Sequence, residues 1–249
     1  MAEVFQLLSR VMGPSSAIRW ISARRHLILL VGVVALQIVQ PLLARDSVVH
    51  RVLYDSAFGA VSLLVSLVIF LRRWERWLAL ALISPAIGAN FAHYALSERS
   101  QALVAAVYHF SAAAFLAFAV AAIVRMILRK RAISGDDVLG AIVGWVLMGL
   151  IWGHFYALTD RLFPGSFSVS AEIAGQLDEW HSRRALFDYF SFTTLTSLGY
   201  GDITPTRAPA FTLVWLEVMF GGFYMAVIVA QLVGIKLAQA LGSDGRGSR

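Results

Sequence analysis

Six long apolar runs, joined by short charged connections, are the strongest constraint on how this chain can fold. They cover about residues 26–44, 56–71, 77–96, 101–128, 136–162 and 207–240. A helix needs about 20 apolar residues to cross the hydrocarbon core of a bilayer, and each run is near that length, the second being the shortest. Because 59% of the residues are hydrophobic and only 14% are charged, the composition excludes a soluble domain. We therefore expect an all-α membrane protein with six transmembrane helices.

The charges between the runs predict the orientation of these helices. Two of the connections are strongly basic, with Arg72, Arg73 and Arg76 after the second run and Arg129, Lys130 and Arg131 after the fourth. The other short connections carry balanced charge, as in Arg45, Asp46, Arg51 and Asp55. Positive residues favour the cytoplasmic side, so both termini are expected in the cytoplasm. The expected location is a bacterial inner (plasma) membrane. Five spans, with an external N-terminus, are the alternative. The net charge of +6 follows this topology and indicates no nucleic-acid partner.

A polar, glycine-rich stretch lies between the last two apolar runs. Residues 196–202 read TSLGYGD, and the apolar segment LFDYFSFTTL precedes them. Glycine adopts backbone conformations that residues with a Cβ avoid, so successive carbonyls of this stretch can point toward one axis. Rings of such oxygens can replace the water shell of a cation. The stretch occurs once in the chain, so a complete ring requires several chains.

This stretch resembles the selectivity filter of tetrameric potassium channels, the family in which carbonyl rings of this kind are best known and whose usual form is TTVGYGD. Ser197 stands where the second threonine is usual and keeps its hydroxyl, and Leu198 stands where valine is usual. The resemblance is specific over about residues 186–235 and only topological before that. It implies a homotetramer that binds potassium ions at Ser197, Leu198, Gly199 and Tyr200, with Gly201 completing the filter.

The resemblance also implies a division of the chain into segments. Residues 26–131 would form a four-helix transmembrane domain, and residues 132–241 a pore domain of outer helix, pore helix, filter and inner helix. We expect residues 1–25 to form a cytoplasmic interfacial helix with a basic segment, because their apolar positions fit one face of a helix too short to span. Residues 242–249 are expected to form a flexible tail.

Several residues around the filter are expected to support it. Tyr189 and Phe190 lie where related channels often carry two tryptophans, so they should brace Tyr200. Thr193 stands where some relatives place a glutamate that pairs with the aspartate equivalent to Asp202. That carboxylate pair is absent here, so support must come from elsewhere. The remaining supporting residues are Thr196, Asp202 and Glu217.

Glu217 is an unexpected carboxyl group inside the last apolar run. An ionisable group at that depth is costly and needs a partner or water. We expect Glu217 to form hydrogen bonds behind the filter or the pore helix, in a protonated form.

The last run is long enough to cross the membrane and continue into the cytoplasm. Gly221 lies 22 residues after Gly199, the spacing at which related inner helices have a hinge glycine, and Gly222 follows it. Beyond them, Met225, Val229 and Val233 recur at helical spacing and are candidates for cavity and gate lining. Packing against the outer helix is the alternative for these three side chains.

The fourth run does not resemble a voltage sensor. Arg125 stands alone before the terminal basic cluster, whereas steep voltage dependence needs about three to four charges per subunit. The apolar cores of the second and third runs also lack acidic partners. We therefore expect little intrinsic voltage dependence.

Two further expectations concern polar residues outside the filter. Asn90, His93, Tyr108 and His109 should form hydrogen bonds between helices, since two histidines without further ligands make a weak metal site. Residues 161–184 should form a solvated loop in which Arg183 and Arg184 offset the acidic side chains; a short cap helix near residues 171–180 is the alternative.

The function expected from these features is passive, potassium-selective conduction across the membrane, with potassium ions and membrane lipids as partners. A weakly selective cation channel is one alternative. A sensor or adaptor that uses a non-conducting pore module for oligomerisation is another. No plausible catalytic set is present in the sequence, so an enzyme is not expected.

Overall fold

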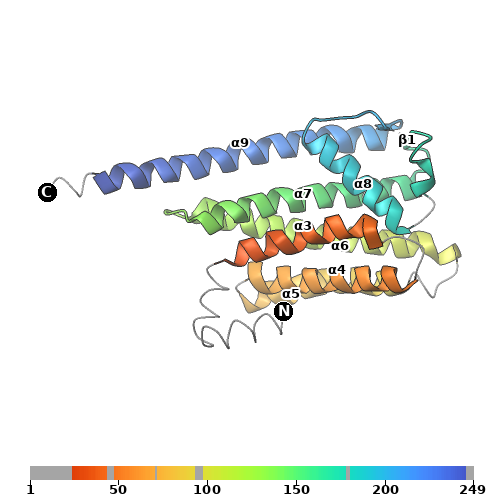
Figure 1. Ribbon diagram of the computed structural model, residues 1–249, viewed down its shortest axis with the longest axis horizontal. Coiled ribbons are helices and arrows are strands. Elements are labelled where there is room, and N and C mark those ends of the chain that lie inside the picture. Colours follow the sequence, from red (N-terminus) through yellow and green to blue (C-terminus); the bar gives the residue numbers. More distant parts are fainter. Residues whose placement is uncertain (1–23, 44–47, 71, 93–97, 178–179, 245–249) are drawn as a thin grey trace.

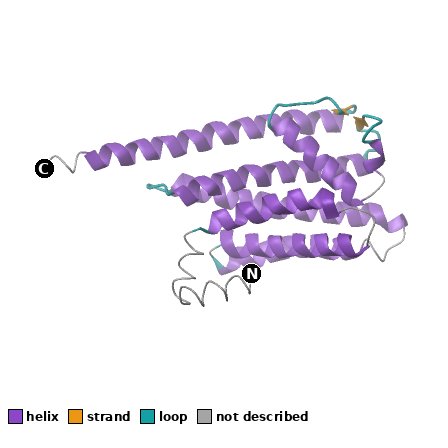
Figure 2. Ribbon diagram, viewed as in Figure 1, coloured by secondary structure: helices purple, strands orange, loops and turns teal. Residues whose placement is uncertain are grey.

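The computed structural model describes residues 24–43, 48–70, 72–92, 98–177 and 180–244. The expectations for residues 1–23, for His93 and for the last five residues of the tail lie outside these ranges. Helices make up nearly all of the described chain, which confirms the expected all-α class (Figure 2). The helices are α3 (Arg25–Leu43), α4 (Val48–Ile69), α5 (Arg73–Ala92), α6 (Glu98–Arg129), α7 (Gly135–Leu162), α8 (Trp180–Leu195) and α9 (Ala208–Asp244). The shorter elements are strands β1 (Phe167–Val169) and β2 (Ile203–Pro205), and the 3-10 helix η1 (Ala174–Leu177).

The long helices lie roughly side by side, and α8 crosses them obliquely near one end (Figure 1). Helices α4 and α5 form one side of the molecule and α9 the opposite side, with α7 between them. We call α3 to α6 the N-terminal helices. Among these, α6 packs closely along α7, and Ala105, Ala112 and Ala119 are fully buried at intervals of seven residues. Small side chains at such positions let two helix backbones approach closely.

Each of the six apolar runs forms a helix, but the described helices differ in how well they suit a membrane. Three of them are long and apolar enough to cross a bilayer, over Ser100–Arg129, Gly135–Leu162 and Ala208–Gln239. Shorter apolar segments occur at Arg25–Val39 and Asp55–Ile69. The structure therefore supports a membrane protein, and six complete spans stay a prediction.

The N-terminal helices contain buried carboxyl groups that the sequence analysis did not expect. Helix α4 begins at Val48 instead of residue 56, so Asp55 lies within the helix and is buried instead of lying in a connection. Glu75, in the first turn of α5, is also buried and binds Arg125 with Nη2 to Oε1 at 2.6 Å. The apolar cores of the second and third runs thus carry no acidic residue, but a carboxyl group at the start of α5 still reaches Arg125, because charged residues near helix ends can enter the bundle where a counter-charge is available.

Helix α7 begins with a capping box. The Ser134 hydroxyl accepts the backbone N–H of Asp137, and the Asp137 side chain accepts the backbone N–H of Ser134. These bonds satisfy N–H groups that the first turn of a helix leaves without partners.

Helix α9 is continuous for 37 residues and leaves most of its apolar surface open. Of the 18 most apolar consecutive residues of α9, only 17% are buried, compared with 67% of the corresponding residues of α7. An apolar helix exposed to this extent needs lipid or further protein around it.

Candidate functional site

The glycine-rich stretch begins directly at the C-terminal end of α8. The Thr193 carbonyl accepts the backbone N–H of Leu198 at 2.8 Å and that of Gly199 at 3.1 Å. The backbone N–H of Ser197 donates to the Thr194 carbonyl at 2.9 Å. These bonds direct the amide groups of the stretch toward the helix and fix its start to the last turn of α8.

The backbone of the stretch alternates in handedness. Ser197, Gly199 and Gly201 have positive φ values of 57°, 53° and 80°. Within the described residues, Ser197 is the one non-glycine residue with positive φ. A non-glycine residue in this region costs about 1–3 kcal/mol and tends to occur at functional sites. Alternation of this kind turns successive carbonyls to one side, whereas the carbonyls of a strand alternate between two sides.

The carbonyl oxygens of residues 197–201 are available to a ligand. In the part of the chain that the structure describes, they accept no hydrogen bond from other protein groups. The residues themselves are exposed in the single chain, with Tyr200 65% exposed. Backbone carbonyls almost always have a partner, so a row without protein partners is chemically suited to a cation.

Tyr189 supports the outer half of the stretch. Its ring stacks on that of Tyr200, with centroids 6.4 Å apart and planes 9° from parallel. Its hydroxyl donates to Asp202 Oδ2 at 2.6 Å. Asp202 Oδ1 accepts the backbone N–H of Ile203 at 3.0 Å. Tyr189 thus contacts both residues that flank Gly201.

Phe190 does not brace Tyr200 within the chain, contrary to expectation. It is buried against Tyr156 and Phe167, with ring centroids 4.9 Å and 5.6 Å away. Consecutive residues of a helix point about 100° apart, so Tyr189 and Phe190 face different neighbours. Phe190 packs α8 against α7, and of these two aromatic residues Tyr189 is the one that contacts the outer part of the glycine-rich stretch.

The chain that follows the stretch is fixed by a small antiparallel sheet. Val169 lies opposite Ile203 and Phe167 opposite Pro205. The backbone N–H of Ser170 also donates to the Asp202 carbonyl at 2.8 Å. The segment before α8 therefore clamps the outer end of the stretch.

The expectation of a solvated loop over residues 161–184 is wrong in two respects. Strand β1 and η1 give the segment secondary structure, and α8 begins at Trp180. Arg184 therefore lies in α8, where it is only 4% exposed. Its hydrogen bond and aromatic contacts with the N-terminal helices outweigh the exposure that an arginine usually prefers.

Glu217 is fully buried where α7, α8 and α9 meet. Its Oε2 accepts the Tyr156 hydroxyl, and its Oε1 lies 2.5 Å from Ser191 Oγ. Ser191 Oγ also lies 2.6 Å from the Gly149 carbonyl oxygen. A serine hydroxyl has one hydrogen, so when Ser191 donates to Gly149 the Glu217 carboxyl must supply the hydrogen of the other bond. The arrangement fits a neutral carboxyl group that links three helices.

Tyr156 and Ser191 were missed by sequence reasoning, although both are close to Glu217 in space. Tyr156 lies in the apolar part of α7, and Ser191 lies between two phenylalanines of α8. Polar side chains at that depth usually bond to one another, and this was the signal that could have paired them with Glu217.

The two glycines expected to form a hinge lie in unbroken helix. A Cβ at Gly221 would overlap the Leu195 side chain, so α9 approaches the end of α8 at this position. A Cβ at Gly222 would meet open space. Gly221 thus has a packing role in this conformation, and a hinge at either position stays a prediction.

The candidates for cavity lining are exposed on α9. Met225, Val229 and Val233 are 49%, 45% and 59% exposed in the single chain. Met225 and Val229 border an apolar groove of about 320 Å³ between α7 and α9, together with Trp145. That position suits packing beside the outer helix, the alternative given above, while Val233 lies outside the groove.

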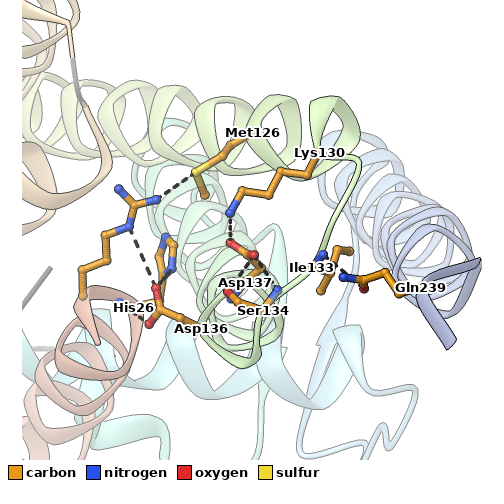
Figure 3. Close-up of polar contacts among 9 residues, drawn as sticks. His26, Met126, Lys130, Ile133, Ser134, Asp136, Asp137 and Gln239 are labelled. Atoms are coloured by element: carbon orange, nitrogen blue, oxygen red, sulfur yellow. Dashed lines mark hydrogen bonds and ion pairs between the residues drawn. The ribbon is translucent and has the colours of Figure 1, made fainter. Parts of the chain in front are cut away.

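Figure 3 shows the N-terminal end of α7, where polar contacts join α3, α6, α7 and α9. Asp136 accepts from His26 Nδ1 at 2.7 Å, and Asp137 binds Lys130. The backbone N–H of Ile133 donates to Gln239 Oε1 at 3.3 Å. These contacts fix the short connection between α6 and α7 beside the extension of α9.

His109 provides an expected hydrogen bond between helices. Its Nδ1 lies 3.0 Å from Nδ1 of His154 on α7. The described residues contain no group of three His, Cys, Asp or Glu side chains that could hold a metal ion.

The fold and this site together define a class of protein: a membrane protein with a short helix and a glycine-rich loop set between two long apolar helices. Residues 141–239 include the short helix, the loop and most of both long helices, and they match a family model described as "Ion channel". The match supports an ion-channel pore-domain family. Neither the curated proteins nor the solved structures gave a match to the chain.

Proposed function

We propose that the chain is one subunit of a homotetrameric channel that conducts potassium passively and selectively across a membrane. The observation that carries the proposal is the backbone of residues 197–201, with its alternating φ signs and carbonyl oxygens that accept no bond from the described protein. Potassium ions would bind between four copies of Ser197, Leu198, Gly199 and Tyr200. Carbonyl oxygens arranged in this way replace the hydration shell of the ion.

The exposed surface of one chain supports assembly. Leu198 and Tyr200 are more than half exposed, and of the most apolar 18 residues of α9 only 17% are buried. A soluble or monomeric arrangement would leave these surfaces uncovered. Four chains around a shared axis would enclose the filter, and lipid would cover the remaining apolar faces.

The distribution of charge supports the proposed orientation. Arg25, Arg125 and Lys130 belong to contacts at the end of the molecule where α6 meets α7, and the filter lies at the other end of α7. Basic residues favour the cytoplasmic side, so the filter would face outside. The chain would then divide near residue 131 into the N-terminal helices and a pore domain. It would lie in a bacterial inner membrane, with both termini in the cytoplasm.

Weak voltage dependence is part of the proposal. Arg125 is the one arginine of α6 between Arg99 in its first turn and Arg129 in its last, and it is held by Glu75. Steep voltage dependence needs about three to four moving charges per subunit, and a single paired arginine does not provide them.

A weakly selective cation channel is the second candidate, and the position of Phe190 favours it. Within one chain only Tyr189 braces Tyr200, so the filter has fewer lateral contacts than two aromatic braces would give. Selectivity depends on how firmly the ring of oxygens is held.

Flux measurements on the full-length protein in liposomes separate the two candidates. Vesicles are loaded with potassium or with sodium, and efflux is driven by the matching gradient in the presence of a proton ionophore. We expect potassium to leave far faster than sodium, and barium to block the flux. Equal rates would support the weakly selective channel, and no flux above protein-free vesicles would contradict both candidates.

A further inference from the structure

Helix α8 is attached to the N-terminal helices through a buried node at its outer half. The node consists of Gln37 on α3, Phe58 on α4, Tyr108 on α6, and Arg184 and Asp188 on α8. Arg184 Nη1 donates to the Tyr108 hydroxyl, and Gln37 Nε2 donates to Asp188 Oδ2 at 3.3 Å. Three N-terminal helices thus meet one helix of the proposed pore domain.

Burial and charge make this node a firm attachment. Arg184 and Asp188 are 4% and 3% exposed, and Arg184 Nε lies 3.8 Å from Asp188 Oδ2. The guanidinium carbon lies 4.5 Å from the Phe58 ring centroid and 5.5 Å from that of Tyr108. A buried charge that loses its partner is strongly unfavourable, and a cation over an aromatic ring gains most when desolvated. Rotation or translation of α8 away from these helices would break both arrangements.

The node is directly connected to the filter through the next residue of α8. Tyr189 follows Asp188, stacks on Tyr200 and donates to Asp202. Any change in the position of α8 at residues 184–188 therefore moves Tyr189, which braces the outer filter. Helix α8 thus contacts both the N-terminal helices and the filter.

The N-terminal helices also contact α9 directly, through α6, whose Ala117, Val120 and Val124 line an apolar groove shared with α7 and α9. Figure 1 shows α9 on the side of α7 opposite to α4 and α5, and the packing of α9 is mainly against α7 and α8. The connection between α6 and α7 is only residues 130–134 and contains no helix. The contact with α9 is apolar, whereas the node holds α8 by a buried ion pair and hydrogen bonds, so the geometry favours action on the filter.

We infer that Arg184 is a positioning residue for the filter, through which the N-terminal helices hold α8 and set the Tyr189 brace. This inference rests on the proposed function, because it takes residues 197–201 as the ion path. By this inference the N-terminal helices influence permeation by positioning the filter, and not by moving charge in response to voltage.

The test compares two neighbouring arginines in the full-length protein. Arg184→Lys keeps the charge and loses the planar group that lies over Phe58, a substitution that is not conservative at a stacked site. Arg183→Lys is the matched control, since Arg183 binds Asp160 of α7 and has no part in the node. The potassium-to-sodium flux ratio is measured for both variants and for the wild type.

We expect Arg184→Lys to lower the flux ratio about tenfold, the effect of one lost bond to a polar or charged group, and Arg183→Lys to leave it near the wild-type value. Arg184→Lys combined with Tyr189→Phe should lower the ratio no further than the larger single effect, because both substitutions act on the same brace. Equal ratios for the two arginine variants, or multiplying effects in the combined variant, would overturn the inference.

Assembly is checked by size-exclusion chromatography before flux is measured. If the Arg184→Lys variant fails to assemble, the double variant Arg184→Met with Asp188→Asn is measured in its place. It removes both charges together, and a buried ion pair tolerates this better than the loss of one partner. A wild-type ratio in that double variant would overturn the inference, and a lowered ratio would support it. A wild type without selective flux would instead contradict the proposed function, so the two failures are distinguishable.

Discussion

At the scale of single residues, the filter is supported by side chains that each carry one specific bond. Tyr189 holds Asp202, and Glu217 connects Tyr156 with Ser191 behind α8. The role of Tyr189 was expected from the sequence, because the resemblance to potassium channels places a bracing aromatic residue at this position. The partners of Glu217 were not, because they come from helices 26 and 61 residues away.

Replacement of Glu217 tests its bonds. Glu217→Gln offers an amide that can donate to Ser191 and accept from Tyr156, so we expect an assembled protein whose conductance or inactivation is altered. Glu217→Leu leaves two buried hydroxyl groups without this partner, at a cost of about 1–3 kcal/mol each. Thermal unfolding in detergent should therefore occur at a lower temperature for Leu than for Gln. A Leu variant with unchanged stability, permeation and gating would show that the bonds have no such role.

Tyr189→Phe tests the brace of the outer filter. The ring and its stacking on Tyr200 remain, and the bond to Asp202 is lost, a contribution of about 1.5–3 kcal/mol for a bond to a charged group. We expect a potassium-to-sodium flux ratio at least about tenfold lower than that of the wild type. Tyr224→Phe is the control, because it loses a buried bond to the Ala141 carbonyl far from the filter. An equal effect of both substitutions on the ratio would argue against the brace.

At the scale of elements, α8 is held by close approach to its neighbours. A Cβ at Gly153 of α7 would lie 3.0 Å from the Asp188 Cα and 3.2 Å from its backbone nitrogen.

Sequence alone located the helices well, because long apolar runs are strong signals. It misplaced the start of α8 and the role of residues 180–184, because the burial of Arg184 depends on Phe58 and Tyr108, which are distant in sequence.

Gly153→Ala should push α8 away from α7. The added methyl group meets backbone that cannot turn aside, and overpacking of this kind costs about 1–3 kcal/mol. Gly222→Ala is the matched control, since the space beside Gly222 is open and alanine favours helix by about 0.5–1 kcal/mol. We expect a lower unfolding temperature for the first variant and an equal or higher one for the second. The reverse order would mean that α7 and α8 are not packed as described.

At the scale of the whole molecule, the single chain leaves large apolar surfaces uncovered. Its glycine-rich stretch and the apolar face of α9 are exposed, and the apolar part of α6 supplies one arginine, Arg125, where a voltage sensor needs several. Both features were expected from the sequence, one from the single copy of the glycine-rich stretch and the other from the isolated Arg125. The pairing of that arginine with Glu75 was visible only in the structure.

Currents from the reconstituted protein should depend weakly on voltage. With about one candidate charge per subunit, the open probability should change far less steeply than in channels that move three to four charges per subunit. Single-channel recording over a range of voltages measures this dependence. A steep rise, with a gating charge comparable to that of known sensors, would contradict the assignment.

The most direct test of the central claim is a density map of the assembled protein in potassium. We predict four chains around one axis, with the carbonyl oxygens of Ser197, Leu198, Gly199 and Tyr200 facing ion density on that axis. A monomer, or carbonyl oxygens turned away from a shared axis with no density between them, would contradict it.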